Sequence, residues 1–423
     1  MTSFEEKCFN IYKSITPKMA KKIIPIIDLA RKLNKKPPIP LREKLCEMKM
    51  PSFNKKVIML HGVSVGEVQS LESLVIRIKL DFPDHALVIT TGTVTGQELA
   101  YKKYGDLADY ITYFPLDIYE ACKKFIKAVN PSIVLIAETE LWPNFAHACK
   151  EKNIPLYIIN GRISDKSYPS YLKIRNFMSL ILQNYTGVFC QSELDRERFI
   201  LLGSNAKNTS VMKNLKFEIE KKECDIDLQT QNSKLIVAGS THAGEEEKIL
   251  KAYKQLRAKV IDLKLLLAPR HLTRLNEVKE LLKNMSLRYG LKSQGNTFQN
   301  HNIIILDTLG ELSKLYALAD IAYIGGSFVN IGGHNPLEAL IYSVPVISGP
   351  SIKNFRDIYS ILQRENAAFV VNDEKELYKT LEKLVYDYDY YKNISNNCKN
   401  CFTNNQGALE FIIKKLKEIL KEN

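Results

Sequence analysis

Short apolar runs alternate with longer amphipathic stretches along most of the chain. In the first half, the apolar runs are residues 57–60, 86–91, 132–138, 156–160 and 187–190. In the second half, they are residues 234–240, 263–270, 302–307, 321–327, 344–348 and 367–371. Continuous apolar strands that alternate with helices are typical of parallel sheets covered on both faces. The pattern therefore predicts an α/β chain with two doubly wound, Rossmann-like domains.

A polar stretch at 218–234 separates the two series of strands. The length of 423 residues fits two or three domains of roughly 150 residues each. Ligands of open α/β sheets bind outside the carboxyl ends of the strands, so we expect the two domains to face a central cleft. The predicted boundaries are an N-terminal amphipathic, membrane-proximal segment at 1–50, domains at 51–220 and 234–404, a linker at 221–233 and a C-terminal helix at 405–423.

The N-terminal stretch TPKMAKKIIPIIDLARKLNKK is basic and amphipathic. Its apolar run from Ile23 to Ile27 is far shorter than the ~20 residues that span a bilayer, and we expect Pro25 to break it. Two interpretations stay open at this point. The segment either lies on an anionic membrane surface or packs as an ordinary helix with one face against the body.

Sixty Lys and Arg residues against 47 Asp and Glu residues give a net charge of +13. Such a surplus suits an anionic partner: nucleic acid, an acidic membrane or a phosphorylated substrate. The basic residues are dispersed and no aromatic platform is interleaved with them, which disfavours nucleic acid. The eight cysteines are scattered, with one CxxC at Cys398 and Cys401. We therefore expect a reducing compartment and no metal site.

Three loops of the second half follow predicted strands. Gly239 to His242 precede a helix whose first turn attracts anions, unless Glu245 and Glu246 simply complement its dipole. Arg270 ends a strand, where its planar fork suits a phosphate better than a surface salt bridge.

The third loop ends in IGGHNPLE, with Asn335 as the expected N-cap and Pro336 as the first helical residue. Glu338 then lies in the first turn, where it either accepts from a ribose or compensates the dipole. A glycine-rich loop, a helix start and an acid together predict a nucleotide site.

The first half carries acids after two strands. Ser64 to Glu67, SVGE, fit a capping box. Glu138 and Glu140 stand beside the only tryptophan, Trp142. This group suggests recognition of a sugar-like acceptor or, alternatively, a helix start at Pro143.

The motifs HGVSVGEV, AETELWPN, INGRISDKS, NLKFE, AGSTHAGEE, APRH, DTLGEL, GGSFVNIGGHNPLEA and GPSIKNF occur in this order between about residues 40 and 360. In order and spacing the chain resembles bacterial lipid A Kdo transferases (Kdo is 3-deoxy-D-manno-octulosonic acid). The resemblance implies a GT-B fold and inverting transfer of Kdo from CMP-Kdo. The implied acceptor is the 6′-hydroxyl of a tetra-acylated lipid A precursor, lipid IVA, in lipopolysaccharide biosynthesis. It also implies that neither a metal nor another cofactor takes part.

The resemblance assigns roles to particular residues. Glu67 matches the general base, and Glu138 and Lys216 match the proposed transition-state stabilisers. The residues that match CMP-binding segments are Pro269, Arg270, Leu309, Gly310, Glu311, Asn335, Pro336, Leu337 and Glu338.

Two departures from the family change the expectations. Its members usually begin with a membrane-anchoring apolar helix, whereas this N-terminus is weakly apolar. We therefore expect peripheral attachment to the cytoplasmic face of the bacterial inner membrane. The usual glycine of Gly-Asn-Leu-Lys is Lys213 here, which changes the backbone freedom before Lys216. The alternatives are another GT-B enzyme (a peptidoglycan nucleotide-sugar transferase or a sugar-nucleotide epimerase), a nucleic-acid-binding protein and an inactive membrane scaffold.

Taken alone, the SVGE pattern favours a structural cap at Glu67. Inversion, however, needs one base that takes the acceptor proton, and no second nucleophilic carboxylate. We therefore predict Glu67 as the base. Arg270, Lys216 and N–H groups at helix starts would meet the charge of the departing phosphate without a metal.

Overall fold

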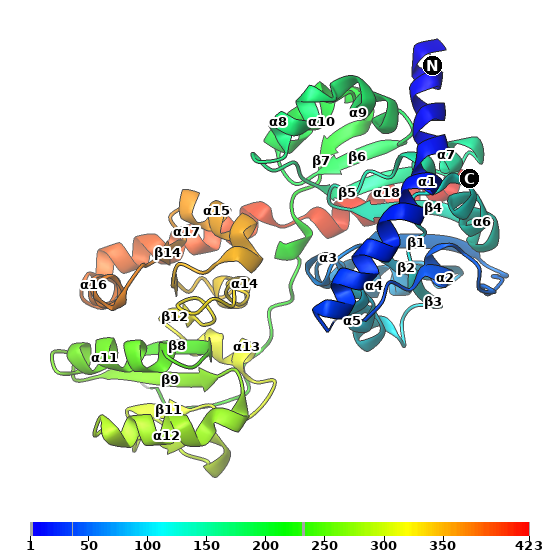
Figure 1. Cartoon of the computed structure of the whole chain (residues 1–423). Coiled ribbons are helices and arrows are strands. Elements are labelled where there is room, and N and C mark those ends of the chain that lie inside the picture. Colours follow the sequence, from blue (N-terminus) through cyan, green and yellow to red (C-terminus); the bar gives the residue numbers. More distant parts are fainter. Residues whose placement is uncertain (1–2, 36, 231–232, 423) are drawn as a thin grey trace. The chain divides into compact units, whose positions relative to one another are not determined.

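The computed structural model describes residues 3–35, 37–230 and 233–422, and the chain divides into two compact units. Unit 1 comprises Met1–Glu218 with Gln406–Asn423, and unit 2 comprises Ile219–Asn405. Each unit is a parallel sheet with helices on its faces (Figure 1).

The sheet of unit 1 has the strand order β3-β2-β1-β4-β5-β6-β7. Its strands are β1 (Lys56–Gly62), β2 (His85–Thr91), β3 (Tyr110–Tyr113), β4 (Pro131–Ala137), β5 (Leu156–Gly161), β6 (Gly187–Cys190) and β7 (Thr209–Val211). Besides α1 (Ser3–Leu33) and α18 (Ala408–Glu422), its helices are α2 (Leu41–Lys44), α3 (Val65–Ser70), α4 (Glu72–Asp81), α5 (Val94–Tyr104), α6 (Tyr119–Val129), α7 (Pro143–Glu151), α8 (Tyr168–Lys173), α9 (Arg175–Leu182) and α10 (Glu193–Leu201).

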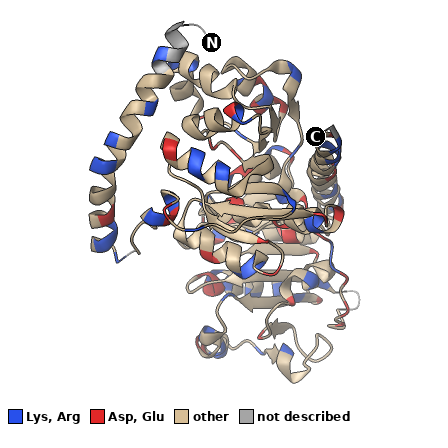
Figure 2. Ribbon diagram, turned by 90° about the vertical axis from the view of Figure 1, so that its right-hand side faces the viewer, with Lys and Arg blue, Asp and Glu red and all other residues tan. Residues whose placement is uncertain are grey.

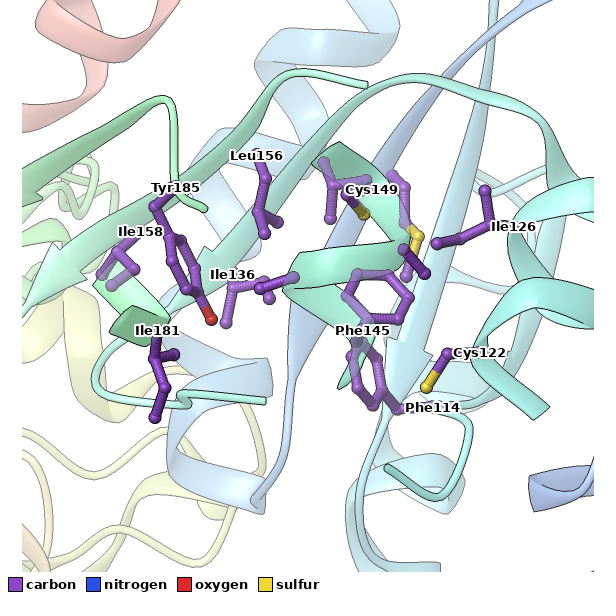
Figure 3. Close-up of a cluster of buried hydrophobic side chains, with 14 of the residues drawn as sticks. Phe114, Cys122, Ile126, Ile136, Phe145, Cys149, Leu156, Ile158, Ile181 and Tyr185 are labelled. Carbon is purple, nitrogen blue, oxygen red and sulfur yellow. The ribbon is translucent and has the colours of Figure 1, made fainter. Parts of the chain in front are cut away.

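Both faces of this sheet are buried. Val57 and Met59 of β1 belong to a cluster with α6, α7 and α9, which Figure 3 shows around Phe145. The alternate residues Ile58 and Leu60 belong to a second cluster with α3 and α4 on the other face. Because each strand is covered twice, its sequence reads as a continuous apolar run.

The sheet of unit 2 has the order β10-β11-β9-β8-β12-β13-β14, and its strand pairs are parallel. The strands are β8 (Lys234–Thr241), β9 (Leu263–Pro269), β10 (Gly290–Leu291), β11 (Ile303–Ile305), β12 (Ile321–Ile324), β13 (Val346–Ser348) and β14 (Ala368–Val370). The helices are α11 (Glu245–Arg257), α12 (Leu275–Asn284), α13 (Leu312–Leu315), α14 (Leu337–Leu340), α15 (Arg356–Arg364), α16 (Glu374–Tyr386) and α17 (Tyr388–Asn405). The prediction of two doubly wound sheets is confirmed.

The segment predicted as a linker belongs to unit 2. Leu228 is buried, and its carbonyl accepts from the Phe298 N–H at 2.8 Å. Ion pairs and hydrogen bonds add to this anchor, such as that between Asp225 Oδ1 and Lys314 Nζ at 2.9 Å. The polar sequence of the segment did not reveal these contacts. The helix after unit 2, α18 (Ala408–Glu422), packs on α4 and adds Ile412 and Leu416 to the core of unit 1.

The N-terminal helix α1 (Ser3–Leu33) runs through both Pro17 and Pro25, so the expected break at Pro25 is wrong. Much of this helix is exposed, and water can take up the carbonyls that proline leaves unpaired. Its first half packs on the rest of unit 1. The Tyr12 hydroxyl donates to Asp117 Oδ2 at 2.9 Å, and Asn144 Nδ2 donates to Thr16 Oγ1 at 3.2 Å.

One side of α1 exposes an apolar stripe along most of the helix. Its exposed apolar side chains are Ile11, Ile15, Met19, Ile23, Ile26, Ile27, Leu29 and Leu33. Figure 2 shows Lys and Arg spaced along the same helix. Among the described residues, no helix has both the length and the apolar character needed to cross a membrane.

Within the described ranges, no group of three or more His, Cys, Asp or Glu side chains is arranged to hold a metal ion. Cys398 and Cys401 of α17 are both buried free thiols. Burial raises the pKa of the Cys401 thiol to about 12.

Candidate functional site

The chain reverses direction across the sheet of unit 1 between β1 and β4, which lie side by side. Loops at the carboxyl ends of two such strands form the usual ligand site of an open α/β sheet. Glu67 lies in α3, which follows β1, and Glu138 directly follows β4. The two carboxylates are close enough for the charge of Glu138 to raise the pKa of Glu67.

Glu67 makes the contacts of a helix cap. Its Oε2 accepts from the Val63 N–H at 2.6 Å, its Oε1 accepts from Ser64 Oγ at 2.9 Å, and its own N–H donates to Ser64 Oγ at 3.4 Å. Burial is the largest influence on its pKa and, together with Glu138, outweighs the hydrogen bonds that stabilise the charged form. The side chain is therefore a cap that also has the raised pKa of a candidate base.

Glu138 sits in a strained backbone position and faces a cation. Its φ is +60°, in the left-handed region, and its Oε1 lies 3.6 Å from Lys216 Nζ. Lys216 lies in the short 3-10 turn Leu215–Phe217. Strain of this kind costs on the order of 1–3 kcal/mol and is concentrated at functional sites.

The substitution of lysine for the family's usual glycine falls on a position that needs unusual backbone freedom. Lys213 has φ +72°. A side chain in this conformation costs roughly 1–2 kcal/mol relative to the right-handed region. The chain keeps the turn that leads to Lys216 in spite of this cost.

Glu140 is the third acid of this region. Burial, followed by the charges of Glu67 and Glu138, raises its pKa to about 7. Trp142, by contrast, packs on the core, with its ring centroid 5.8 Å from that of Phe114. The tryptophan thus supports the structural interpretation, a helix start at Pro143, since α7 begins there.

Replacing Glu140 by Gln should change the pH dependence of stability. The wild-type carboxyl holds its proton up to about pH 7, whereas an ordinary glutamate has a pKa of 4.5. Its stabilising contribution is therefore complete below the unfolded pKa and is lost as the pH rises through the folded pKa. The Tm of Glu140→Gln relative to wild type should rise between about pH 5 and about pH 8. Thermal melts check this, with exposed Glu120→Gln as the control, and a difference that stays constant with pH contradicts it.

The predicted nucleotide-binding residues of unit 2 gather at one edge of its sheet. Pro269 ends β9 and Arg270 follows it, Leu309 to Glu311 follow β11, and Asn335 to Glu338 follow β12. Gly310 has φ +83° and Leu309 is 79% exposed. Glu311 Oε1 lies 3.8 Å from Lys292 Nζ. All these loops follow carboxyl ends of parallel strands, as the sequence predicted.

The Glu338 side chain is more buried than expected for a surface carboxylate that only compensates a helix dipole. Burial raises its pKa, while the charges of Lys222 and Arg270 lower it. The helix α14 begins at Leu337, one residue later than predicted, with Pro336 as its cap. Asn335 still performs the expected capping contact, because its Oδ1 accepts from the Leu337 N–H at 3.1 Å.

Glu245 is a contributor that the sequence did not reveal. The sequence offered dipole compensation at the start of α11 as one of two interpretations, but the Glu245 side chain is fully buried. Its Oε1 accepts from the N–H groups of Ser327 and Phe328 at 2.9 and 2.8 Å, and its Oε2 accepts from Gly326 N at 2.6 Å. The carboxylate fixes the glycine-rich loop, a contact that no sequence period signals.

Comparison with known proteins identifies the family. The family model described as 3-deoxy-D-manno-octulosonic-acid transferase (kdotransferase) matches residues 40–219. A 3-deoxy-D-manno-octulosonic acid transferase of Haemophilus influenzae is 34% identical over 376 residues, and the match covers 86% of this chain and 88% of that protein. A bifunctional glycosyltransferase/methyltransferase of Fusobacterium nucleatum is 37% identical over 374 residues, and the match spans 86% of this chain and 57% of the longer protein.

Among solved structures, MurG of Acinetobacter baumannii matches 86% of this chain and 99% of its own, with a TM-score of 0.56 and 13% identity. Identity this low shows the fold alone, which is GT-B as predicted. The sequence similarity shows more than the fold. This chain belongs to the 3-deoxy-D-manno-octulosonic acid (Kdo) transferase family of glycosyltransferases.

Proposed function

We propose that the protein transfers Kdo from CMP-Kdo to the 6′-hydroxyl of a tetra-acylated lipid A precursor, lipid IVA, with inversion. The proposal rests on the position and the raised pKa of Glu67 in unit 1. In a chain of this family, a carboxylate with a raised pKa stands where the sheet reverses direction. A raised pKa brings a carboxylate nearer to the value that serves proton abstraction at neutral pH.

The proposed roles divide between the units. Glu67 of unit 1 takes the proton of the acceptor hydroxyl, and the Glu138–Lys216 pair, 3.6 Å apart, stabilises charge in the transition state. Arg270 of unit 2 binds the phosphate of CMP. Glu338 accepts from the ribose, since its carboxylate lies in the first turn of α14 beside the charge of Arg270.

The test is a reaction with purified protein, CMP-Kdo and lipid A precursor. The expected result is an acceptor whose mass has grown by whole Kdo units, together with free CMP. UDP sugars serve as the control donors. Turnover of a UDP sugar without any transfer of Kdo would overturn the proposal.

We further propose that the reaction is metal-independent, because Arg270 and Lys216 stabilise the negative charge of the leaving phosphate. Turnover should therefore survive excess EDTA. Assays with EDTA, followed by addition of Mg²⁺ or Mn²⁺, check this expectation. A loss of activity that either metal restores would contradict it.

The proposed location is the cytoplasmic face of the inner membrane, with α1 on the anionic lipid surface. Exposed Lys21 and Lys22 lie among the apolar side chains of this helix. Each basic residue near such a surface contributes about 1 kcal/mol. High salt or alkaline carbonate should then release the protein, whereas release by detergent alone would contradict peripheral attachment.

Reversal of both lysines, Lys21→Glu with Lys22→Glu, sharpens the membrane test. Binding to anionic vesicles should fall at least about tenfold, because two favourable charge contacts become unfavourable. Reversal of the exposed pair Lys392 and Lys399 of α17 gives the same change of net charge as a control. Equal losses in both double variants would point to overall charge and not to α1.

A further inference from the structure

Two imidazoles of unit 2 lie in direct contact. His242 Nε2 and His334 Nε2 are 2.9 Å apart, and the two rings are parallel to within 5° with centroids at 5.2 Å. His271 stands edge-on to His242 with a centroid distance of 5.5 Å. None of these three residues has a role in the function proposed above.

The pair spans the point where the sheet of unit 2 reverses direction. β8 and β12 are neighbours, and the chain continues from β8 to β9 on the other side. His242 follows β8, and His334 lies in the loop after β12. Ligands of open α/β sheets bind at this position, between the loops of the two strands. Each histidine comes from one of these two loops.

The loops that carry the histidines are fixed to each other. Buried Glu245 accepts from the His242 N–H at 3.0 Å and from the Gly326 N–H at 2.6 Å through the same oxygen, Oε2. Gly326 has φ +69°, and a Cβ there would lie 3.0 Å from His334 Cδ2. The His334 imidazole therefore packs directly on the backbone of Gly326, which has no side chain. The two loops thus hold the histidine pair in a fixed arrangement.

The contact between two Nε2 atoms restricts the protonation states. One imidazole must donate and the other must accept, which leaves one Nδ1–H and one Nδ1 lone pair on the neutral pair. A further proton can go to that lone pair without breaking the Nε2–H···Nε2 bond. The charged pair then has one positive charge and two Nδ1–H donors.

Without a ligand, the surroundings favour the neutral pair. Burial is the largest influence and lowers the pKa of both histidines, that of His334 to about 4 with help from His242 and Arg270. The charged and titratable groups that face the pair are Glu245, Glu246, Arg270, His271 and Arg274, and only the two glutamates favour protonation. A phosphate held by Arg270 would add negative charge, which raises the pKa of a nearby imidazole.

We propose that the His242–His334 pair is a phosphate subsite that takes up one proton from solvent when the nucleotide binds. The proton goes to the free Nδ1, and the charged pair then holds the phosphate together with Arg270. No covalent bond forms or breaks in this step. The inference rests on the proposed function, because the phosphate is that of CMP.

Calorimetric titration with CMP at about pH 7, in buffers of different ionisation enthalpy, counts the protons that accompany binding. Wild type should take up a substantial part of one proton per CMP, and His242→Gln and His334→Gln should abolish this uptake. Cytidine, which lacks the phosphate, should bind without proton uptake. The affinity of wild type for CMP should also fall by up to tenfold per pH unit between the pKa of the free pair and the higher pKa of the bound pair, and that of the variants should not.

His301→Gln is the matched control, since His301 precedes β11 and its Nε2 lies 3.1 Å from Asn296 Oδ1. This variant should take up protons on CMP binding as wild type does. Binding of CMP without proton uptake by wild type would overturn this inference and leave the proposed function intact. Absence of CMP binding by wild type would overturn both. If neither variant folds, equal proton counts for CMP and cytidine with wild type would overturn the inference.

Discussion

Glu67→Gln should lower Kdo transfer by at least ~10²-fold, the usual contribution of a general base. The amide keeps the shape of the carboxylate, and one oxygen can still accept from the Val63 N–H. Its NH₂ group can donate to Ser64 Oγ, which accepts as readily as it donates. The fold should therefore persist, but the amide cannot take the proton of the acceptor hydroxyl. Melting, CMP binding and turnover are measured on the same preparation.

Ser64→Ala is the matched variant for the capping role. It removes the hydroxyl that accepts from the Glu67 N–H and leaves the carboxylate in place. The expected result is a loss of about 1 kcal/mol in stability with most of the turnover kept. If Glu67→Gln is likewise less stable but nearly normal in turnover, Glu67 is not the general base.

Arg270→Ala should weaken CMP binding by about 1.5–3 kcal/mol, which is about 10- to 150-fold in Kd. Arg270 follows β9 at the carboxyl edge of its sheet, and its side chain is exposed there. A guanidinium in that position can hold two phosphate oxygens with two parallel N–H donors. The measurement is a titration of CMP into folded wild type and variant.

Arg288→Ala removes the same charge from an exposed side chain that precedes β10, at the amino edge of the sheet. Its affinity for CMP should remain close to that of wild type. A loss equal to that of Arg270→Ala would mean that CMP responds to net charge alone. Unchanged binding in Arg270→Ala would contradict the assignment of the phosphate contact.

The apolar pattern predicted the interior of both sheets and missed strands at their edges. Each of the eleven apolar runs overlaps a strand, whereas β3, β7 and β10 were not predicted. All three are edge strands. β7 has three residues and β10 has two, too few to display a period, and edge strands need less continuous burial than central ones.

The sequence predicted that the candidate residues of each unit lie near one edge of its sheet, because parallel strands send every following loop to the same edge. It did not show which side chains meet. The contacts of Glu245 and the pairing of His242 with His334 depend on loop conformations at residues such as Gly326, with φ +69°. No helical or strand period encodes such conformations, and a single sequence contains no record of the contact.

Because unit 1 contains both ends of the chain, unit 2 is an insertion within it. Glu218, the last residue before unit 2, accepts from the N–H groups of Gly407 and Ala408 at 2.6 and 2.8 Å, and thereby ties the start of α18 back to unit 1. During synthesis, unit 2 has all of its strands before the side chains of α18 that complete the core of unit 1 are made. Domains generally fold as units while the chain is being made. Unit 2 can therefore fold ahead of unit 1, although most of unit 1 precedes it in the sequence. A ribosome that stops before α18 would leave an open apolar face on unit 1.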